Sequence, residues 1–200
     1  MEHCCYVKRT YRQTRRAEAS ARTRRRIVEA AIQLHTTVGP ARTTISALAE
    51  LAGVERLTVY RHFPNEEELF QACVTQGWEQ FPPPDHRAWT PITDPEERLR
   101  AALSELYAYY GTVGDGLSVI VQDFPHVPTL AALNAPHLAK WDAMCDVLAR
   151  GWNRRGRSRQ ALLAAIAHSI DLSTWESLVR RQGLAEADAI ALLVGMVRSV

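Results

Sequence analysis

The stretch from Thr44 to Phe70, TISALAELAGVERLTVYRHFPNEEELF, has small and apolar residues at the spacing that a helix-turn-helix requires. Ala49 is small enough to lie where two helices cross. Gly53 supplies the turn residue with positive φ that other residue types adopt only at a cost. The residues expected to close the core of this unit are Ile45, Leu48, Val54 and Val59. The pattern therefore predicts two short helices joined by a tight turn.

The second of these helices, from Glu55 to His62, is expected to present donors and apolar tips suited to base edges and phosphates. Apolar residues at helical spacing over Arg22–Val38 predict a preceding helix, so that three helices share one core. DNA is therefore the expected partner; the alternative is a short helical hairpin without a DNA role. The expected DNA contacts are Arg22, Arg24, Arg25, Arg26, Thr43, Thr44, Glu55, Arg56, Leu57, Thr58, Tyr60, Arg61 and His62.

These residues resemble the N-terminal signature of the TetR family of bacterial transcriptional regulators. That signature is TT-x-x-x-(I/L)-A-x-x-A-G-V followed by T-(V/L)-Y-x-H-F-P, and the resemblance covers Arg22 to Cys73. It implies an all-helical C-terminal domain that dimerises and binds a small-molecule effector, without naming that effector. It also implies that the helix after the motif is shared between the DNA-binding and ligand-binding domains.

The chain departs from the family pattern at three positions. Glu55 stands where a Ser or Thr usually caps the recognition helix, Leu57 where a small residue is usual, and Glu66 where a Lys is common. Leu57 is expected either to touch a thymine methyl group or to pack on Leu51 without reaching a base. Glu55 is expected to accept from a cytosine amino group, and Glu66 places a like charge near the DNA backbone.

Charge is distributed unevenly along the chain. Residues 1–26 contain nine Lys/Arg and two Asp/Glu, so this segment carries +7 and the remainder −5 of a net charge of +2. Residues 1–21 are interpreted as a basic, disordered arm, either contacting the DNA backbone or remaining a solvated tail. No stretch approaches the roughly 18 apolar residues of a membrane span, so no membrane partner and a cytoplasmic location are expected.

The four cysteines indicate neither a disulfide framework nor a zinc site, because no pair has C-x-x-C spacing. Cys4 and Cys5 follow His3, a cluster that could hold a stray metal ion but lacks the further ligands of a tetrahedral site. Cys73 and Cys145 are solitary. No metal and no cofactor are therefore expected, and the absence of a catalytic motif argues against an enzyme.

The whole chain is expected to be all-α, with about nine helices. A three-helix head over residues 22–72 is followed by an antiparallel helical bundle over residues 73–200, which binds ligand and dimerises. Pro95 follows the capping residue Asp94, and Gly111, Gly114 and Gly116 are expected to end the helix that starts there. The segments expected after the head are helices over 66–80, 95–110, 117–122, 138–152, 158–182 and 186–199, with one or two loose turns over 127–135.

The C-terminal domain gathers aromatic rings, hydroxyls and an imidazole, a mixture typical of a pocket for an apolar ligand. The alternative is an ordinary aromatic core. The expected pocket residues are Leu103, Tyr107, Tyr110, Leu138, Trp141, Met144, Cys145, His168, Leu172 and Trp175, with His126, His137 and Asp171 as weaker candidates.

Helix 158–182 is apolar on more than one face, which, with helix 186–199, predicts a two-fold four-helix interface between subunits. The resulting hypothesis is a homodimeric repressor that binds a pseudo-palindromic DNA operator and is released by an apolar or amphipathic small molecule. The alternative is a regulator that responds to no ligand and whose C-terminal domain only dimerises.

Overall fold

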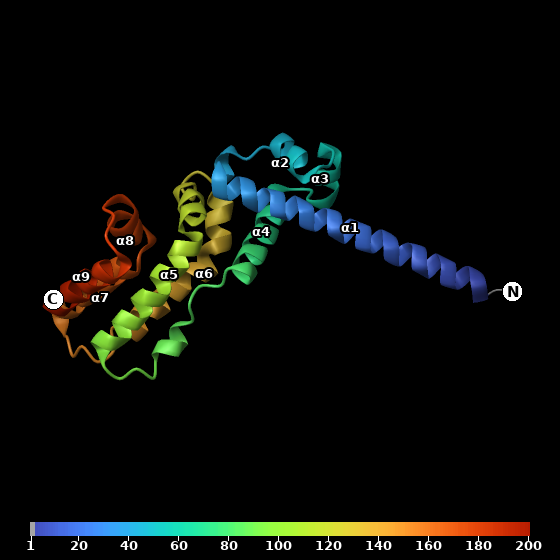
Figure 1. The fold of residues 1–200 in the computed structure, drawn as a ribbon. Coiled ribbons are helices and arrows are strands. Elements are labelled where there is room, and N and C mark those ends of the chain that lie inside the picture. Colours follow the sequence, from blue (N-terminus) through green and yellow to red (C-terminus); the bar gives the residue numbers. More distant parts are fainter. Residues whose placement is uncertain (1–2) are drawn as a thin grey trace.

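The computed structural model describes the backbone of residues 3–200 and the side chains of residues 14–200. Within residues 3–200 it contains helices and no strand, which confirms the all-α prediction (Figure 1). The α-helices are α1 (His3–Thr37), α2 (Ile45–Ala52), α3 (Arg56–His62), α4 (Glu66–Gln80), α5 (Pro95–Gln122), α6 (Pro128–Leu148), α7 (Gly156–Ile170), α8 (Leu172–Trp175) and α9 (Glu186–Ser199). Shorter turns are η1 (Pro40–Arg42), η2 (His86–Trp89) and the π-helical η3 (Glu176–Arg181).

The head consists of the C-terminal half of α1 with α2, α3 and the start of α4. The residues that form its buried core are Ile27, Val28, Ala30, Ala31, Leu48, Ala49, Ala52, Val59, Phe63, Leu69 and Cys73. The hydroxyl of Thr44 caps α2 by accepting from the amide of Ala47 at 3.2 Å, and Asn65 caps α4 through the amide of Glu68 at 2.9 Å. These local signals explain why the predicted head helices form.

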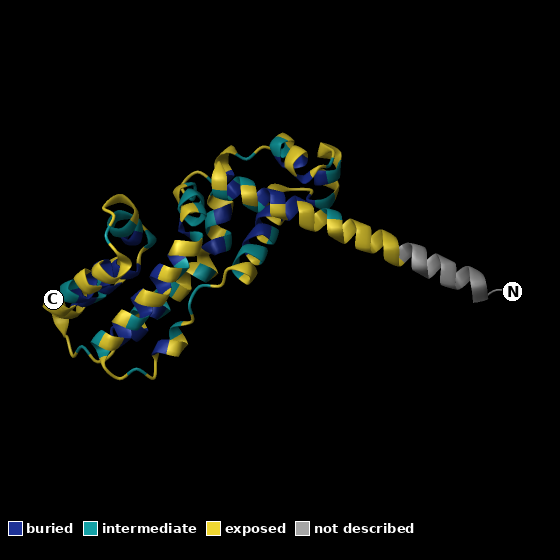
Figure 2. Ribbon diagram, viewed as in Figure 1, coloured by how far each residue is buried: buried dark blue, intermediate teal, exposed yellow. Residues whose placement is uncertain are grey.

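The N-terminal segment differs from the sequence-based expectation. Where a disordered arm is predicted up to residue 21, α1 is already helical from His3. The sequence from Thr14 to Arg26 contains no Gly or Pro and is rich in Ala and Arg, which favour helix. Figure 2 shows this part of α1 exposed where it extends beyond the head.

Helix α5 runs through the three glycines that are predicted to end it. A Cβ atom on Gly114 would lie 2.6 Å from Cζ3 of Trp175, and one on Gly116 would lie 2.8 Å from Cβ of Thr36. Both glycines therefore allow other side chains to approach the backbone of α5 closely. The prediction of a break is wrong because packing against α1 and α8 offsets the low helix propensity of glycine, about 1 kcal/mol per residue.

Two further predicted boundaries are also wrong. α6 is one helix from Pro128 to Leu148, because Leu130 in its first turn is buried against α4 and holds the segment expected to be loose turns. Conversely, the helix expected over 158–182 breaks at Asp171, whose backbone is extended (φ −73°, ψ 138°). The carboxylate of Asp171 accepts from the amide of Ser173 at 2.8 Å and so starts α8.

Two other clusters complete the fold. The body core is formed by residues of η2 and of the helices from α5 through α9. It includes the largest buried side chains, among them Trp89, Tyr107, Tyr110 and Trp175. A smaller joint cluster consists of Phe70, Val74 and Leu130, with half-buried apolar residues from α4, α5 and α6 around it. The joint cluster lies between the head and the body, so α4 contributes to both.

We expect Gly114→Ala to lower the free energy of unfolding by about 1–3 kcal/mol, because the added methyl group overpacks a buried tryptophan. The matched control is Gly77→Ala in α4, where a Cβ atom would meet no atom within 4 Å. That change should stabilise the protein by about 0.5–1 kcal/mol through helix propensity. Urea denaturation of both variants measures the difference, and equal effects of the two substitutions would contradict the close-approach argument.

Candidate nucleic-acid interface and adjoining cavity

The turn between α2 and α3 has the backbone that the sequence predicts. Gly53 has φ 61° and ψ 45°, and its amide donates to the carbonyls of α2. Val59 is completely buried, which fixes one face of α3 against the head and turns the opposite face outward. The residues exposed on that outward face are Arg56, Leu57, Tyr60 and Arg61.

Leu57 is the most exposed large apolar residue of the head, at 74%. Leu51 is itself 44% exposed, so neither leucine is buried, and the contact of Leu57 with a base stays a prediction. Glu55 precedes the first turn of α3, and its carboxylate makes no capping bond there. An exposed apolar tip beside an uncommitted carboxylate can contact a thymine methyl group and a cytosine amino group, respectively.

Two of the arginines predicted to contact DNA bind the head itself. Arg24 donates to the carbonyl of His62 at 2.8 Å, and its guanidinium lies 4.0 Å from the centre of the Phe63 ring. Arg26 donates to the carbonyls of Ala52 and Gly53. These carbonyls are at or just beyond the C-terminal ends of α3 and α2, where helix carbonyls lack an intrahelical partner. Arg24 and Arg26 therefore hold the recognition helix in place.

The other predicted contacts have mixed surroundings. Arg22 and Arg25 are exposed, whereas Thr43 is half-buried and donates to the carbonyl of Gly39 at 2.9 Å. The hydroxyl of Thr58 accepts from Arg61 at 3.5 Å. The pKa of His62 is lowered by burial and by the charges of Arg61 and Arg24.

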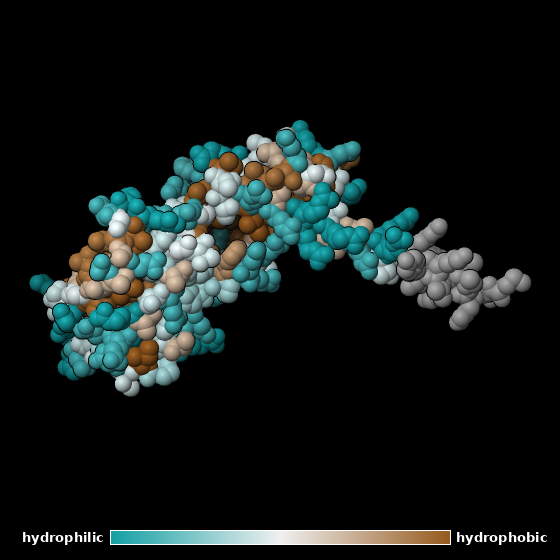
Figure 3. Space-filling view, viewed as in Figure 1, coloured by the Kyte–Doolittle hydropathy of each residue, from teal (hydrophilic) through white to brown (hydrophobic). Residues whose placement is uncertain are grey.

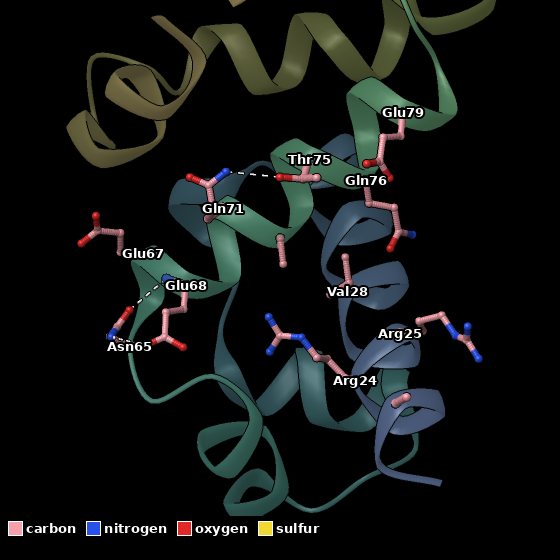
Figure 4. A pocket seen from close by; sticks show the side chains of 12 residues that line it. Arg24, Arg25, Val28, Asn65, Glu67, Glu68, Gln71, Thr75, Gln76 and Glu79 are labelled. Atoms are coloured by element: carbon pink, nitrogen blue, oxygen red, sulfur yellow. Dashed lines mark hydrogen bonds between the residues drawn. The ribbon is translucent and has the colours of Figure 1, made fainter. Parts of the chain in front are cut away.

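A wide groove of about 800 Å³ is lined by residues of α1 and α4. Arg24 and Arg25 both line this groove, and Figure 4 shows their side chains extending in opposite directions from α1. Glu67 and Glu68 lie on the α4 side of the groove. They are in the first turn of α4, where negative charge stabilises a helix by interacting with its dipole. The groove is thus lined by opposite charges, unlike the second cavity of the molecule.

That second cavity, of about 380 Å³, lies where α1 passes α4, α5 and α6. Apolar side chains gather around a hollow at this place in the space-filling view (Figure 3). The lining residues are Ile32, His35, Thr36, Cys73, Val74, Gly77, Trp78, Phe81, Tyr109, Thr112, Val113, Gly116, Leu117, Ile120, Leu130 and Asn134. The volume is within the range of small-molecule pockets.

Burial keeps the titratable groups of this cavity uncharged at neutral pH. It lowers the pKa of His35 to about 4, against the opposing charge of Asp123. It raises the pKa of the Cys73 thiol to about 12 and that of the Tyr109 hydroxyl to about 12. The cavity therefore presents a neutral, largely apolar surface.

The residues predicted to form a ligand pocket mostly lie in the body core instead. Leu103, Tyr107, Tyr110, Met144 and Trp175 are at most 1% exposed and line none of the cavities described above. The hydroxyl of Tyr107 donates to the carbonyl of Ser169 at 3.3 Å, and that of Tyr110 to the carbonyl of Ile170 at 2.6 Å. The tyrosines thus satisfy the C-terminal carbonyls of α7, which the break at Asp171 leaves without helical partners.

The remaining predicted pocket residues are dispersed. Leu138, His168 and the weaker candidate His126 are exposed, and Cys145 and Leu172 are half-buried at the edge of the body core. Trp141 meets the edge of Trp78, with ring centres 6.5 Å apart, and His137 stacks on Trp78 at 4.4 Å. Sequence reasoning missed His35 and Trp78 as cavity residues. His35 is in a helix assigned to the head, and Trp78 is in helix 66–80, whereas the predicted pocket residues all follow later in the chain.

Within the described part of the chain, no three His, Cys, Asp or Glu side chains lie close enough to hold a metal ion. The cluster His3, Cys4 and Cys5 lies outside the residues whose side chains the structure describes. The same described residues include no helix with the length and apolar character needed to cross a bilayer.

Comparison with known proteins matches residues 27–73 to the family model of bacterial regulatory proteins, tetR family. The HTH-type transcriptional regulator TtgR of Pseudomonas putida is 48% identical over 60 residues, which are 30% of this chain and 29% of that protein. The HTH-type transcriptional activator FasR of Mycolicibacterium smegmatis is 27% identical over 127 residues, 62% of this chain and 58% of that one. The aligned part is thus less than a third of the length of TtgR.

Among solved structures, a TetR-like transcriptional regulator from Rhodococcus sp. RHA1 superposes with a TM-score of 0.58 at 19% identity, covering 88% of this chain and 93% of the other. A mutant of the HlyIIR protein superposes with a TM-score of 0.61 at 14% identity, covering 88% and 95%. At these identities the likeness establishes a shared fold, a helix-turn-helix head on a helical C-terminal domain.

Arg26→Gln is expected to lower the free energy of unfolding by about 1 kcal/mol, because two helix-end carbonyls lose a charged donor. Its matched control is Arg25→Gln, the neighbouring arginine, which is exposed. On a nonspecific duplex, Arg25→Gln should flatten the slope of log K against log salt by about one unit, as for a lost phosphate contact. Arg26→Gln should leave that slope unchanged. The opposite pattern in the two variants would make Arg26 the phosphate ligand.

Buried His35 is expected to make stability depend on pH. Because its pKa of about 4 in the folded protein is below the value of 6.5 for an ordinary histidine, the unfolded chain binds the proton first. The contribution is fully present above pH 6.5 and is lost as pH falls toward 4, to a total of about 3 kcal/mol. His35→Gln should remove this component, measured as the difference between wild type and variant in unfolding free energy across the same pH range. Parallel curves would contradict a neutral buried histidine.

Proposed function

We propose that this chain, which belongs to the tetR family of bacterial regulatory proteins, is a homodimeric transcriptional repressor that binds a DNA operator and is released by a small molecule. The observation that carries the proposal is the outward face of α3, with Arg56, Leu57, Tyr60 and Arg61 exposed in a head of helix-turn-helix geometry. Such a face can enter a major groove, with donors for phosphates and bases. A DNA partner also implies a cytoplasmic location in a bacterium.

The exposure of the side chains and their hydrogen bonds support different roles for the residues of this interface. We assign Leu57 and Glu55 to base contacts, and the exposed arginines to phosphates, because only the former can distinguish thymine methyl and cytosine amino groups. Arg24 and Arg26 act by positioning α3, through the carbonyls of His62, Ala52 and Gly53.

Dimerisation is supported by an apolar surface on the last helices. Leu192 is 55% exposed on α9 and borders a hollow of about 480 Å³. Leu178, Leu193 and Met196 also line this hollow. The rest of the lining is polar: His168, Ser173, Thr174, Ser177 and Arg181. A two-fold interface uses the same patch on both subunits, so an exposed leucine next to a hollow with both apolar and polar walls is suited to self-association. We place the dimer interface on this surface.

The proposal predicts a dimer in solution that protects two half-sites related by pseudo-two-fold symmetry. Their centres should be about one helical turn of DNA apart, or slightly more, because each subunit offers one recognition helix. Size-exclusion chromatography with light scattering and footprinting on the selected operator test this. A monomer, or one unsymmetrical protected site, would contradict the proposal. Since FasR is named an activator, a reporter assay measures the sign, and activation would overturn the repressor assignment.

Leu192→Glu should convert the dimer into monomers at micromolar concentration and weaken operator binding, because the buried charge appears twice in a two-fold interface. The control is Leu138→Glu, which introduces the same charge at a leucine of similar exposure (45%) on α6. Analytical ultracentrifugation of both variants gives the result. Dissociation by the control alone would place the interface elsewhere.

A further inference from the structure

We propose that the effector is an uncharged, largely apolar aromatic molecule, and that it binds in the cavity between α1, α4, α5 and α6. The inference rests on the proposed function only in calling the ligand an effector. The binding site and the class of ligand follow from the lining residues themselves, as set out below.

The walls of the cavity are aromatic on several sides. Trp78, Phe81, Tyr109 and His35 come from α4, the residue after it, α5 and α1, respectively. Trp78 is held in position from α6, since its indole Nε1 donates to Oδ1 of Asn134 at 3.2 Å and its ring stacks on another α6 side chain. A fixed ring of this kind favours a flat aromatic ligand by offset or edge contacts.

The hydroxyl and amide groups of the lining donate their hydrogens within the protein. Thr36 donates to the carbonyl of Ile32 at 2.9 Å, and Thr112 to that of Ala108 at 3.2 Å. Tyr109 donates to the carbonyl of Phe81 at 3.3 Å. The side-chain amide of Asn134 donates to the carbonyl of Leu130 at 2.9 Å. A ligand rich in polar groups would find these donors already engaged, whereas an apolar ligand leaves the bonds intact.

No Asp, Glu, Lys or Arg is found among the described residues that line this cavity. Its histidine, cysteine and tyrosine are held neutral by the same desolvation that would act on a bound ion. The charges of Lys140, with Nζ 5.9 Å from the centre of the Trp78 ring, and of Asp123, which acts on His35, are outside the lining. A charged ligand would lose hydration without gaining a partner of opposite charge in the lining, which costs several kcal/mol. The cavity therefore selects against both carboxylates and ammonium groups.

The position of the cavity makes its ligand a contact between head and body. Ile32 packs against the head core and Cys73 belongs to it, while Val113 and Leu117 are on α5 of the body. A molecule in this cavity touches both groups at once. Its binding energy therefore depends on how α1 and α4 lie relative to α5.

The test uses two fluorescent probes that share one aromatic skeleton. N-phenyl-naphthylamine is uncharged, and anilinonaphthalene sulfonate carries one negative charge. We expect the wild-type dimer to bind the neutral probe with one saturable site per subunit, and the sulfonate at least about tenfold more weakly. Equal affinity for the two probes, or no saturable binding of the neutral one, would overturn the proposal.

The second test asks whether the probe binds in this cavity, and uses the substitution Val113→Trp in its lining. The larger side chain should fill the space and lower the affinity for the neutral probe by about tenfold or more. Val121→Trp is the matched control, the same substitution on the same helix at an exposed position outside the lining. Thermal melts confirm that both variants fold. Loss of binding in both variants, or in neither, would place the probe at another site.

Failure of this inference can be separated from failure of the proposed function. Probe binding is measured without DNA, so saturable, charge-selective and Val113-dependent binding supports the ligand site whatever the operator assay gives. If the bound probe leaves operator affinity unchanged, the proposal that it acts as an effector is overturned while the site stands. If operator affinity falls but Val113→Trp has no influence, the regulatory function stands and this cavity is excluded.

Discussion

The close packing of α5 against α1 on one side and Trp175 on the other is the constraint on which the arrangement of head and body depends. Gly114 and Gly116 are two residues apart on α5 and face different directions, toward Trp175 and Thr36. A side chain at either position would hold one neighbour away from the helix. Because interiors are close-packed and transmit displacement, α5 couples the position of the head helix to the packing of the body core.

The parts of the fold that are encoded locally could be predicted from the sequence. Thr44, Gly53 and Asn65 act within three or four residues of themselves, so the turn and the starts of α2 and α4 are visible in the chain. The glycines of α5 are different, because their partners are Thr36 and Trp175, far away in sequence. Without those partners, a glycine in a helical segment indicates an end. The same limitation applies to Asp171, whose role as a cap depends on a break that tertiary packing selects.

The candidate site shows the same division between local and distant information. That α3 presents an exposed face could be inferred from the spacing of its apolar residues. Which arginines are available to DNA could not, since Arg24 and Arg26 meet carbonyls that follow 38 and 26 residues later. Likewise, Tyr107 and Tyr110 have the composition of a ligand pocket, yet their hydroxyls are needed by the end of α7. Buried polar side chains are hydrogen-bonded, and here the two hydroxyls bond to backbone carbonyls that would otherwise lack a partner.

The close approach of Thr36 on α1 to Gly116 on α5 limits how near the two helices can come. Both residues also line the cavity, so the cavity adjoins this contact. Beyond this contact, the carboxylate of Asp123 at the end of α5 accepts from the amide of Ala41 in the head at 2.9 Å. Because this bond is exposed to solvent, it contributes about 0.5–1.5 kcal/mol, which overlaps only the lower end of the coupling of about 1–3 kcal/mol between sites in allosteric proteins. A ligand that altered this one bond by shifting α5 relative to α1 would therefore change the free energy of the head by part of such a coupling. The short path from cavity to head makes a long chain of intermediate contacts unnecessary.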